Sequence, residues 1–248
     1  MTPQTHARDG FVTYDELSGP DLDVARWTPA RIPLPTGGEH IPLDPNAELA
    51  VSEGEVRVTI PRFSLSDDRF QSADSAKYLA YSTRRFELPP DRPATFAVDM
   101  AVENIDGEPG DYRRGMASFA VFDLEVSKRV FAVDGTSTRV FAMHEQVGVF
   151  GGGAGEPFYH VVESPYEDFD DDFTRLRTCE ITLDRSNSTA TWRVDGQKVY
   201  DAHTFIPERA QIGFGIWTML PDRDGRSRSL DGQGLTARWR GFRVRLGG

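Results

Sequence analysis

The sequence predicts an all-β protein with a single β-sandwich domain, and three observations support this prediction. About a dozen short segments alternate apolar and polar residues at regular spacing, which is the pattern of sandwiches and barrels. Turn-forming dipeptides such as Asp195-Gly196 separate several of these segments. Only residues 20–26 and 207–210 have a composition that suits a helical turn.

The first half of the chain begins with an expected loose tail over residues 1–10, and the single domain covers residues 11–248. Residues 55–60 alternate cleanly, with the two valines and the isoleucine inward. Pro89-Pro90 ends the strand or strands predicted over residues 77–88. Residues 116–125 are apolar on both faces, as in a central strand that is covered on both sides. The predicted strands of this half are residues 11–17, 48–51, 55–60, 77–88 (one long strand or two short ones), 95–103 and 116–125.

In the second half, Asp134-Gly135 is expected to form a turn, because this dipeptide favours tight hairpins. The clearest hairpin joins residues 174–183 to residues 189–194 through DRSNS. The predicted strands of this half are residues 129–133, 139–150, 157–163, 174–183, 189–194, 198–201, 211–220 and 234–246.

Composition and charge exclude several classes of function. The chain has 248 residues and a formal net charge of −11, which disfavours a nucleic-acid backbone as a partner. Its first residues, MTPQTHARDG, lack the features of a secretory signal, and no apolar run approaches the roughly 18 residues of a membrane span. We therefore expect a cytoplasmic protein that binds neither nucleic acid nor membrane.

The single cysteine, Cys179, excludes an internal disulfide framework. It lies in an alternating run, so we interpret it as a packed thiol rather than a nucleophile. Four arginines alternate along the last predicted strand, and we interpret them as a solvated sheet face. They are Arg238, Arg240, Arg243 and Arg245.

The predicted strand over residues 139–150 carries the most unusual polar pattern and runs into three glycines at 151–153. Strand side chains alternate between two faces. One face then carries Phe141, Met143, Glu145, Val147 and Val149, and the other carries Ala142, His144, Gln146 and Gly148. His144 and Gln146 would lie about 7 Å apart on one surface. A polar pair on the floor of a sheet needs solvent or a ligand to satisfy it.

Three stretches of the chain carry a resemblance to a known fold family. They are YDELSGPDLDVARWTP at residues 14–29, the long hairpin with WRVDG at residues 172–205, and the closing strand GLTARWRGFRVR. In this order they resemble the concanavalin-A-like jelly rolls of the laminarinase type. The resemblance implies a β-sandwich of two curved antiparallel sheets, with a ligand groove on the concave sheet.

The retaining hydrolases of that family carry a Glu-x-Asp-x-Glu strand after the strand that corresponds to residues 116–125. On one alignment Ala142, His144 and Gln146 occupy the three carboxylate positions here, and Glu145 has the wrong parity. A register shift of one residue would bring Glu145 into the groove, but without a second carboxylate two residues away. Retention needs two carboxyl groups about 5 Å apart. We therefore reject ordinary glycoside hydrolysis.

The catalytic candidates all lie on this strand. His144 would transfer a proton near neutral pH, or is simply hydrogen-bonded within a polar sheet face. Gln146 would hold a ligand carbonyl or hydroxyl group, or would satisfy His144. Glu145 is either an outward surface charge or, under the shifted register, a catalytic carboxylate.

The substrate-binding candidates are Trp217, Tyr78, Tyr81, Asp123, Phe119 and Arg84. Trp217 shares a face with two glycines, which would leave room for a stacked ligand, although core packing is the alternative. Tyr78 and Tyr81 have opposite parity, so at most one of them reaches the groove. Asp123 and Phe119 share a face; Asp123 would act as a general acid or would mark a strand end in solvent. Arg84, like Lys77, would bind an acidic group or form an exposed salt bridge.

No metal or cofactor is predicted. The glycines 151–153 do not open a helix, so we interpret them as a rim of the groove rather than a phosphate cradle. The acidic residues 166–173 lack the spacing of a known calcium loop and are expected to form a solvated loop.

Two functional hypotheses follow from these observations. The first is an intracellular enzyme that holds a small, partly apolar substrate in the groove and acts by proton transfer and substrate shaping, as an isomerase, lyase or cyclase of a biosynthetic pathway. The second is a non-catalytic carbohydrate-binding protein derived from a glucanase. A row of exposed aromatic residues along an open cleft would favour the second hypothesis.

Overall fold

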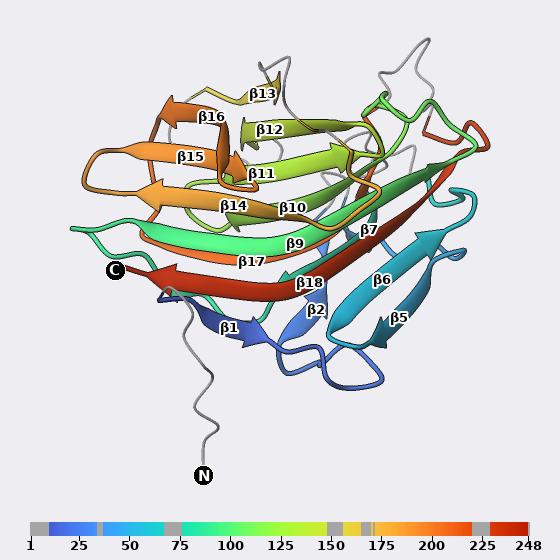
Figure 1. Ribbon diagram of the computed structural model, residues 1–248, viewed down its shortest axis with the longest axis horizontal. Helices are drawn as coiled ribbons and strands as arrows, with labels where there is room; N and C mark the ends of the chain where they lie inside the picture. Colours follow the sequence, from blue (N-terminus) through green and yellow to red (C-terminus); the bar gives the residue numbers. More distant parts are fainter. Residues whose placement is uncertain are drawn as a thin grey trace.

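The computed structural model describes residues 10–33, 37–66, 76–147, 156–164, 170, 172–219 and 229–247. Within these residues the chain is all-β, and two large antiparallel sheets stack face to face (Figure 1). The predicted fold class is confirmed. None of the described residues belongs to a helix long and apolar enough to cross a membrane.

The two sheets, here called sheet I and sheet II, each contain eight strands. Sheet I has the order β16 (Gln197–His203), β15 (Thr189–Val194), β14 (Arg177–Asp184), β9 (Ala94–Ile105), β18 (Gly234–Leu246), β6 (Glu55–Ile60) and β5 (Glu48–Ser52), and β1 (Val12–Asp15) also pairs with β18. Sheet II has the order β13 (Phe158–Glu163), β12 (Arg139–Gln146), β11 (Arg129–Thr136), β10 (Met116–Asp123), β17 (Arg209–Trp217), β7 (Ala76–Ser82) and β2 (Trp27–Pro29), and β8 (Phe86–Glu87) pairs with β17. A small sheet joins β3 (Ile32–Pro33) to β4 (Glu39–His40).

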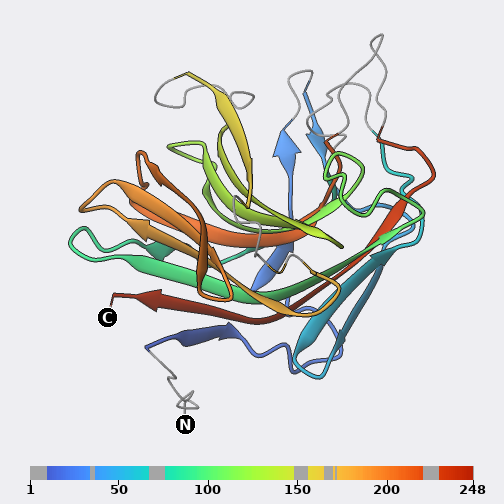
Figure 2. The ribbon, with the colours of Figure 1, turned by 45° about the horizontal axis from the view of Figure 1, so that its top comes forward.

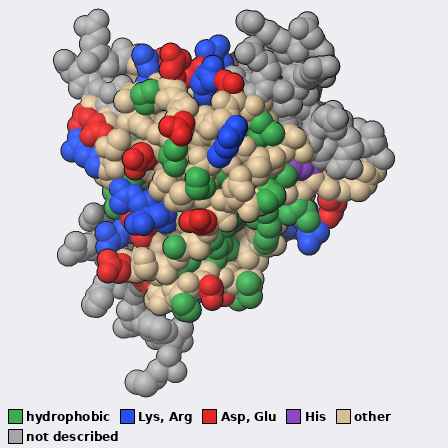
Figure 3. Space-filling model, turned by 90° about the vertical axis from the view of Figure 1, so that its right-hand side faces the viewer, with side chains coloured by type: hydrophobic (Ala, Val, Ile, Leu, Met, Phe, Trp, Pro, Cys, Tyr) green, Lys and Arg blue, Asp and Glu red, His purple; other side chains and the backbone are tan. Residues whose placement is uncertain are grey.

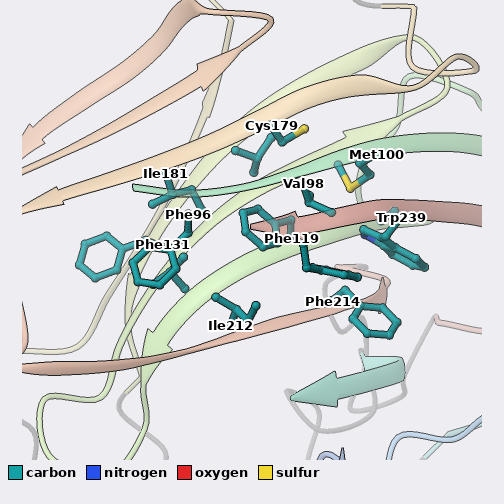
Figure 4. Close-up of a cluster of buried hydrophobic side chains, with 14 of the residues drawn as sticks. Phe96, Val98, Met100, Phe119, Phe131, Cys179, Ile181, Ile212, Phe214 and Trp239 are labelled. Carbon is teal, nitrogen blue, oxygen red and sulfur yellow. The ribbon is translucent and has the colours of Figure 1, made fainter. Parts of the chain in front are cut away.

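The core lies between the sheets, where every second side chain of each strand meets the opposite sheet. Phe214 of β17 lies near its centre, with its ring centroid 5.0 Å from Trp27, 4.8 Å from Trp239 and 5.4 Å from Phe242. Figure 4 shows Phe119 and Phe214 of sheet II lying near Phe96, Val98 and Trp239 of sheet I. Aromatic pairs at these separations stabilise a fold beyond the area that they bury.

Polar groups of buried tryptophans fasten this core at two points. The indole nitrogen of Trp239 donates to the backbone oxygen of Ser118 at 3.1 Å and so connects the two sheets. The indole nitrogen of Trp27 donates to Oδ2 of Asp15 at 2.7 Å. These bonds satisfy donors that would otherwise be buried without a partner.

Cys179 is a free, fully buried thiol of the core, and burial raises its pKa. This placement matches the packed thiol expected from the sequence.

On the outer face of sheet I, Arg238 pairs with Glu55 at 3.6 Å and Arg243 pairs with Asp99 at 2.9 Å. Figure 3 shows acidic and basic side chains interspersed on one side of the molecule.

One expectation about local structure was wrong, and the structure decides two further points. Asp134-Gly135 does not form a turn but continues β11, because Ser118 and Ala117 of β10 pair with these two residues. Residues 77–88 form two strands, β7 and β8, which the sequence had left open. The helical turns considered at residues 20–26 and 207–210 are replaced by a short turn and by the start of β17.

We predict that Phe214→Ala lowers the free energy of unfolding by about 3–5 kcal/mol, because it removes a ring from the centre of a close-packed core. Chemical denaturation monitored by tryptophan fluorescence measures this loss. The matched control is Val24→Ala, because Val24 is 87% exposed and its truncation should change stability by less than about 0.5 kcal/mol. A loss near 1 kcal/mol for Phe214→Ala would contradict the assignment of this ring to the core centre.

Candidate functional site

The outer face of sheet II, the face turned away from sheet I, is the candidate site. Figure 2 shows that sheet II curves, with β13 (yellow) rising at one side of it. The strand register arranges the side chains of this face in rows that cross the strands. One row contains Tyr159, Glu145, Val130, Phe122 and Gln211.

A second row lies at the other end of the same strands. It contains Glu163, Phe141, Asp134, Ser118 and Gly215. Between the two rows lie smaller side chains, Ala132, Ala120 and Gly213, flanked by Met143. The face is therefore mainly apolar, with Glu145 in the first row and with Asp134 and the exposed Glu163, which pairs with Arg139, in the second.

His144 and Gln146 do not lie on this face. The core side of β12 carries Ala142 together with them. The His144 ring stacks on Phe131 with centroids 5.2 Å apart, lies 5.8 Å from Trp192 of sheet I, and its Nε2 is 3.2 Å from Oγ1 of Thr204. The expectation that His144 and Gln146 line a groove was wrong, because the opposite parity of β12 turns them toward sheet I.

The His144 imidazole is adapted to this interior position. Burial, together with the smaller effects of the nearby Arg129 and His160, lowers the pKa of His144 to about 4. The ring is therefore neutral at neutral pH and packs as an aromatic group. A catalytic role for His144 or Gln146 stays a prediction. The position in a groove, from which that role was argued, is not found.

Glu145 points to the outer face, as the shifted register had allowed. Its side chain is half-buried beside Tyr159 on β13. Burial raises the pKa of Glu145 to about 7, and the charge of Asp134 contributes to the same shift. Glu145 is therefore able to gain or lose a proton near neutral pH.

The strand that directly follows β10 is β11, not β12, so the comparison with the Glu-x-Asp-x-Glu strand belongs on β11. The outer face of β11 carries Val130, Ala132 and Asp134 at the two-residue spacing of such a motif, followed by Thr136. Only Asp134 is acidic. Sequence reasoning missed this residue, because Asp134-Gly135 resembled a turn; the alternation of VFAVDGT was the signal that could have found it.

Asp134 is a buried carboxyl group in an unusual environment. It is 1% exposed, and neither of its oxygens makes a hydrogen bond of good geometry with the described residues. Burial raises the pKa of Asp134 to about 7, and the hydroxyl of Ser118, opposite on β10, lowers it to a smaller extent. The hydroxyl of Thr136, on the same face, is buried and makes no hydrogen bond with the part of the chain that the structure describes.

Asp134 and Glu145 do not form a close pair. Glu145 lies opposite Val130, which is four residues from Asp134 along β11. Four residues span about 13 Å along a strand. Each carboxyl group therefore works in its own surroundings, with only a long-range effect of one charge on the other.

The two glycines of β17 do not leave space for a ligand, contrary to expectation. A Cβ on Gly213 would lie 2.9 Å from the Phe122 ring, and a Cβ on Gly215 would lie 2.4 Å from the backbone oxygen of Tyr78. Neighbouring protein atoms occupy the space. Trp217 does lie on the outer face, half-buried and opposite Met116.

The tyrosine and phenylalanine candidates divide between the two faces. Tyr78 and Phe119 belong to the core, so their expected contact with a groove ligand was wrong; burial raises the pKa of Tyr78 to about 12. Tyr81 lies on the outer face with its ring 4.6 Å from Phe122, and burial raises its pKa. The alternative that only one of the two tyrosines reaches this face is confirmed.

The charged candidates lie around the edge of the sheet. Arg84 is exposed, with its guanidinium 5.0 Å from the ring centroid of Phe86. Lys77 is fully buried, and its Nζ donates to the backbone oxygen of Leu65 at 2.6 Å and to Oγ of Ser229 at 2.8 Å. The expectation of an exposed salt bridge was therefore wrong for Lys77.

Asp123 ends β10 and organises the turn that follows. Its carboxylate accepts hydrogen bonds from the backbone nitrogens of Glu125, Val126 and Ser127 at 2.7–3.1 Å. Burial raises the pKa of Asp123, but these hydrogen bonds outweigh burial and hold it below its usual value. Asp123 is thus a turn-forming carboxylate that also lines a surface pocket of about 500 Å³.

Among the described residues, no group of three or more His, Cys, Asp or Glu side chains is arranged to hold a metal ion. The three glycines at 151–153 and most of the acidic loop at 166–173 lie outside the described residues.

The geometry above defines a jelly-roll sandwich of the glucanase type, and solved structures agree. The endo-1,3-beta-glucanase from Streptomyces sioyaensis matches with a TM-score of 0.61 and 11% identity, covering 99% of this chain and 100% of that chain. The Bacillus licheniformis beta-glucanase matches with a TM-score of 0.56 and 15% identity, over 94% and 96%. The LamAcat structure from Zobellia galactanivorans matches with a TM-score of 0.57 and 9% identity, over 96% and 98%. At these identities the likeness shows the fold alone.

Residues 24–247 match the model of a "Family of unknown function (DUF6081)", and the chain belongs to this family. No curated protein matches the sequence. The family carries no assigned activity, so the function has to be argued from the site.

We predict that Asp134→Asn changes how stability depends on pH. The folded-state pKa of Asp134 lies above its ordinary value of 3.8, at about 7, so the folded chain holds this proton more tightly than the unfolded chain. Stability contributed by the protonated group is therefore full below pH 4 and is lost as pH rises to about 7. Asparagine does not titrate, so the variant should gain on the wild type between pH 5 and pH 8, by at most about 4 kcal/mol.

Urea denaturation at a series of pH values measures this difference. Asp91→Asn is the matched control, because Asp91 is exposed and the substitution should leave the pH dependence unchanged. A constant difference between Asp134→Asn and the wild type across this range would show that Asp134 stays ionised in the folded chain.

Proposed function

We propose that the outer face of sheet II binds a neutral, hydroxyl-bearing molecule of the carbohydrate type and acts on it by proton transfer. Asp134 is the group that would exchange the proton. The observation that supports this proposal is the buried Asp134 carboxyl, whose oxygens lack good hydrogen bonds among the described residues. Burying a polar group without a partner is costly, and such groups cluster where a ligand completes them.

The raised pKa of Asp134 suits this role. A general acid or base works best when its pKa lies near the working pH, because both protonation states are then populated. At about 7, the pKa of Asp134 meets this condition. A proton that the carboxyl group gives to one substrate atom and takes from another leaves the protein unchanged, so an isomerase, lyase or cyclase reaction needs no cofactor.

Hydrolysis of the retaining or inverting kind has weaker support. It needs two carboxyl groups about 5 Å apart for retention, or about 6.5–9.5 Å apart for inversion. Asp134 and Glu145 are offset by four residues, about 13 Å along the strands. Glu163 lies two strands from Asp134 in the same row, and its carboxylate is paired with Arg139. The string Glu-x-Asp-x-Glu also occurs nowhere in the chain.

The charge and polarity of the face favour a neutral ligand. The pKa values of Asp134 and Glu145 are both raised. Either carboxyl group, when ionised, would repel an anionic ligand beside it. Apolar side chains, including Phe141 and Met143, lie beside them on the same face. The glucanase names of the structural relatives point to a hydroxyl-rich ligand class.

The cytoplasmic location expected from the N-terminal residues stays a prediction.

A second candidate function is carbohydrate binding without catalysis. Trp217 and Tyr81, both half-buried, lie on the same face as Asp134, and aromatic rings provide contact surfaces for the apolar faces of sugar rings. In that case Asp134 would hold a ligand hydroxyl group by a hydrogen bond and would transfer no proton.

Binding and deuterium exchange distinguish the two functions. Neutral gluco-oligosaccharides and monosaccharides are incubated with the protein in D2O, and mass spectrometry detects carbon-bound deuterium in the recovered ligand. Proton transfer predicts deuterium uptake that falls by about 100-fold or more in Asp134→Asn and is unchanged in Asp91→Asn. Calorimetric binding without deuterium uptake would favour the binding function, and absence of binding across the panel would reject the proposed ligand class.

A further inference from the structure

A cluster of basic and aromatic side chains lies at one edge of sheet II, on the side that faces the core. β13 is the edge strand there (Figure 1). On the core side of β13, Phe158 and Val162 are only half-buried and His160 is exposed. His144 and Ala142, which lie opposite on β12, are buried. Sheet I therefore leaves this edge accessible to solvent and to small molecules.

Arg129 of β11 reaches this edge across β12. In the register of sheet II, Arg129 lies opposite Gln146, and Gln146 lies opposite Phe158 of β13. The guanidinium carbon of Arg129 is 4.8 Å from the centroid of the Phe158 ring and lies over that ring. A guanidinium group held over an aromatic ring still has N–H donors at its rim, and these donors are available to a ligand.

The Arg129 guanidinium has no acidic partner among the described residues. It donates no hydrogen bond and forms no ion pair there, and burial lowers its pKa with no opposing effect of a nearby carboxylate. Asp123 lies opposite Arg129 on β10, but the Asp123 carboxylate accepts the three hydrogen bonds of the turn that follows. Arginine stays protonated at neutral pH. A half-buried positive charge is thus left uncompensated, although the chain has 39 acidic and 28 basic residues.

We propose that this edge binds a small molecule through a carboxylate group, which Arg129 holds by two parallel hydrogen bonds. Two N–H groups of one guanidinium match the two oxygens of a carboxylate. A counter-charge also offsets part of the cost of burying the cation. The site lies on the opposite face of sheet II from Asp134, so this inference does not rest on the function proposed for that residue.

The surroundings of Arg129 favour a ligand with a single negative charge. Burial keeps the imidazole of His144 neutral, and its Nε2 lies 3.2 Å from Oγ1 of Thr204. Of the basic groups in this cluster, only Arg129 is then permanently charged. A second negative charge, as on phosphate, would lack a permanent partner in a chain of net charge −11. The exposed His160 ring, 5.0 Å from the Phe158 ring, can add one hydrogen bond to a carboxylate oxygen.

The test is a titration of the whole chain with benzoate, benzamide and inorganic phosphate, followed by NMR spectra that resolve the arginine side-chain N–H groups. Benzamide has the shape of benzoate without its charge. We expect benzoate to shift the side-chain signal of Arg129 and the amide signals of Phe158 and His160 along one saturating curve. Benzamide should bind at least about tenfold more weakly. Equal binding of benzoate and benzamide, or tighter binding of phosphate than of benzoate, would overturn the proposal.

Three variants complete the test. Arg129→Gln should weaken benzoate binding by about tenfold or more, because it removes the charge and the paired donors. Arg129→Lys keeps the charge and should weaken binding by a smaller factor, because an ammonium group does not form the two parallel bonds. Arg92→Gln is the control and should change nothing, because Arg92 is exposed and lies beside Gly247, just after β18.

Undiminished binding of benzoate to Arg129→Gln would show that the guanidinium does not hold the carboxylate, and would reject the inference. Asp134→Asn should bind benzoate as the wild type does. Failure of this inference is therefore distinct from failure of the proposed function.

Discussion

The packing of aromatic rings between the two sheets determines which side chains of sheet II reach its outer face. Phe214 contacts Trp27, Trp239 and Phe242 at the same time, so β17 cannot rotate or slip without breaking several contacts. Because strand side chains alternate strictly, a fixed core face also fixes the opposite face. The register of β10, β11 and β12 then places Asp134 and Glu145 outward and His144 inward.

The alternation of apolar and polar residues was sufficient to predict the fold class, most strands and the buried thiol. It assigned the wrong face of β12 to the core, because His144 and Gln146 have the polarity of surface residues. They are tolerated inside because burial keeps the imidazole neutral and Thr204 and Trp192 of the opposing layer accommodate it. It also failed at Asp134-Gly135, where the pairing of β10 outweighs the local turn preference of the dipeptide. Local sequence contains no information about that pairing.

The most unusual energetic feature of the fold is a carboxyl group placed where folding gains nothing from it. An apolar side chain at Asp134 would suit a buried strand position better, since the described surroundings leave its oxygens without good hydrogen bonds. Side chains of this kind are common where activity and stability make opposite demands. The glycines of β17, by contrast, are explained by packing alone. A larger side chain at either position would collide with Phe122 or with the backbone of Tyr78, so no ligand is needed to explain them.

β18 is both the longest and the last of the described strands, and it pairs with β9, β6 and β1 in the middle of sheet I. Sheet I therefore remains in three separate parts, β16 to β9, β6 with β5, and β1, until residues 234–246 have left the ribosome. Contacts between such distant segments form slowly, because closing long loops costs entropy before any contact compensates for it. Until then the edges of β9 and β6 that β18 covers have no partner strand, and unpaired strand edges are prone to aggregation.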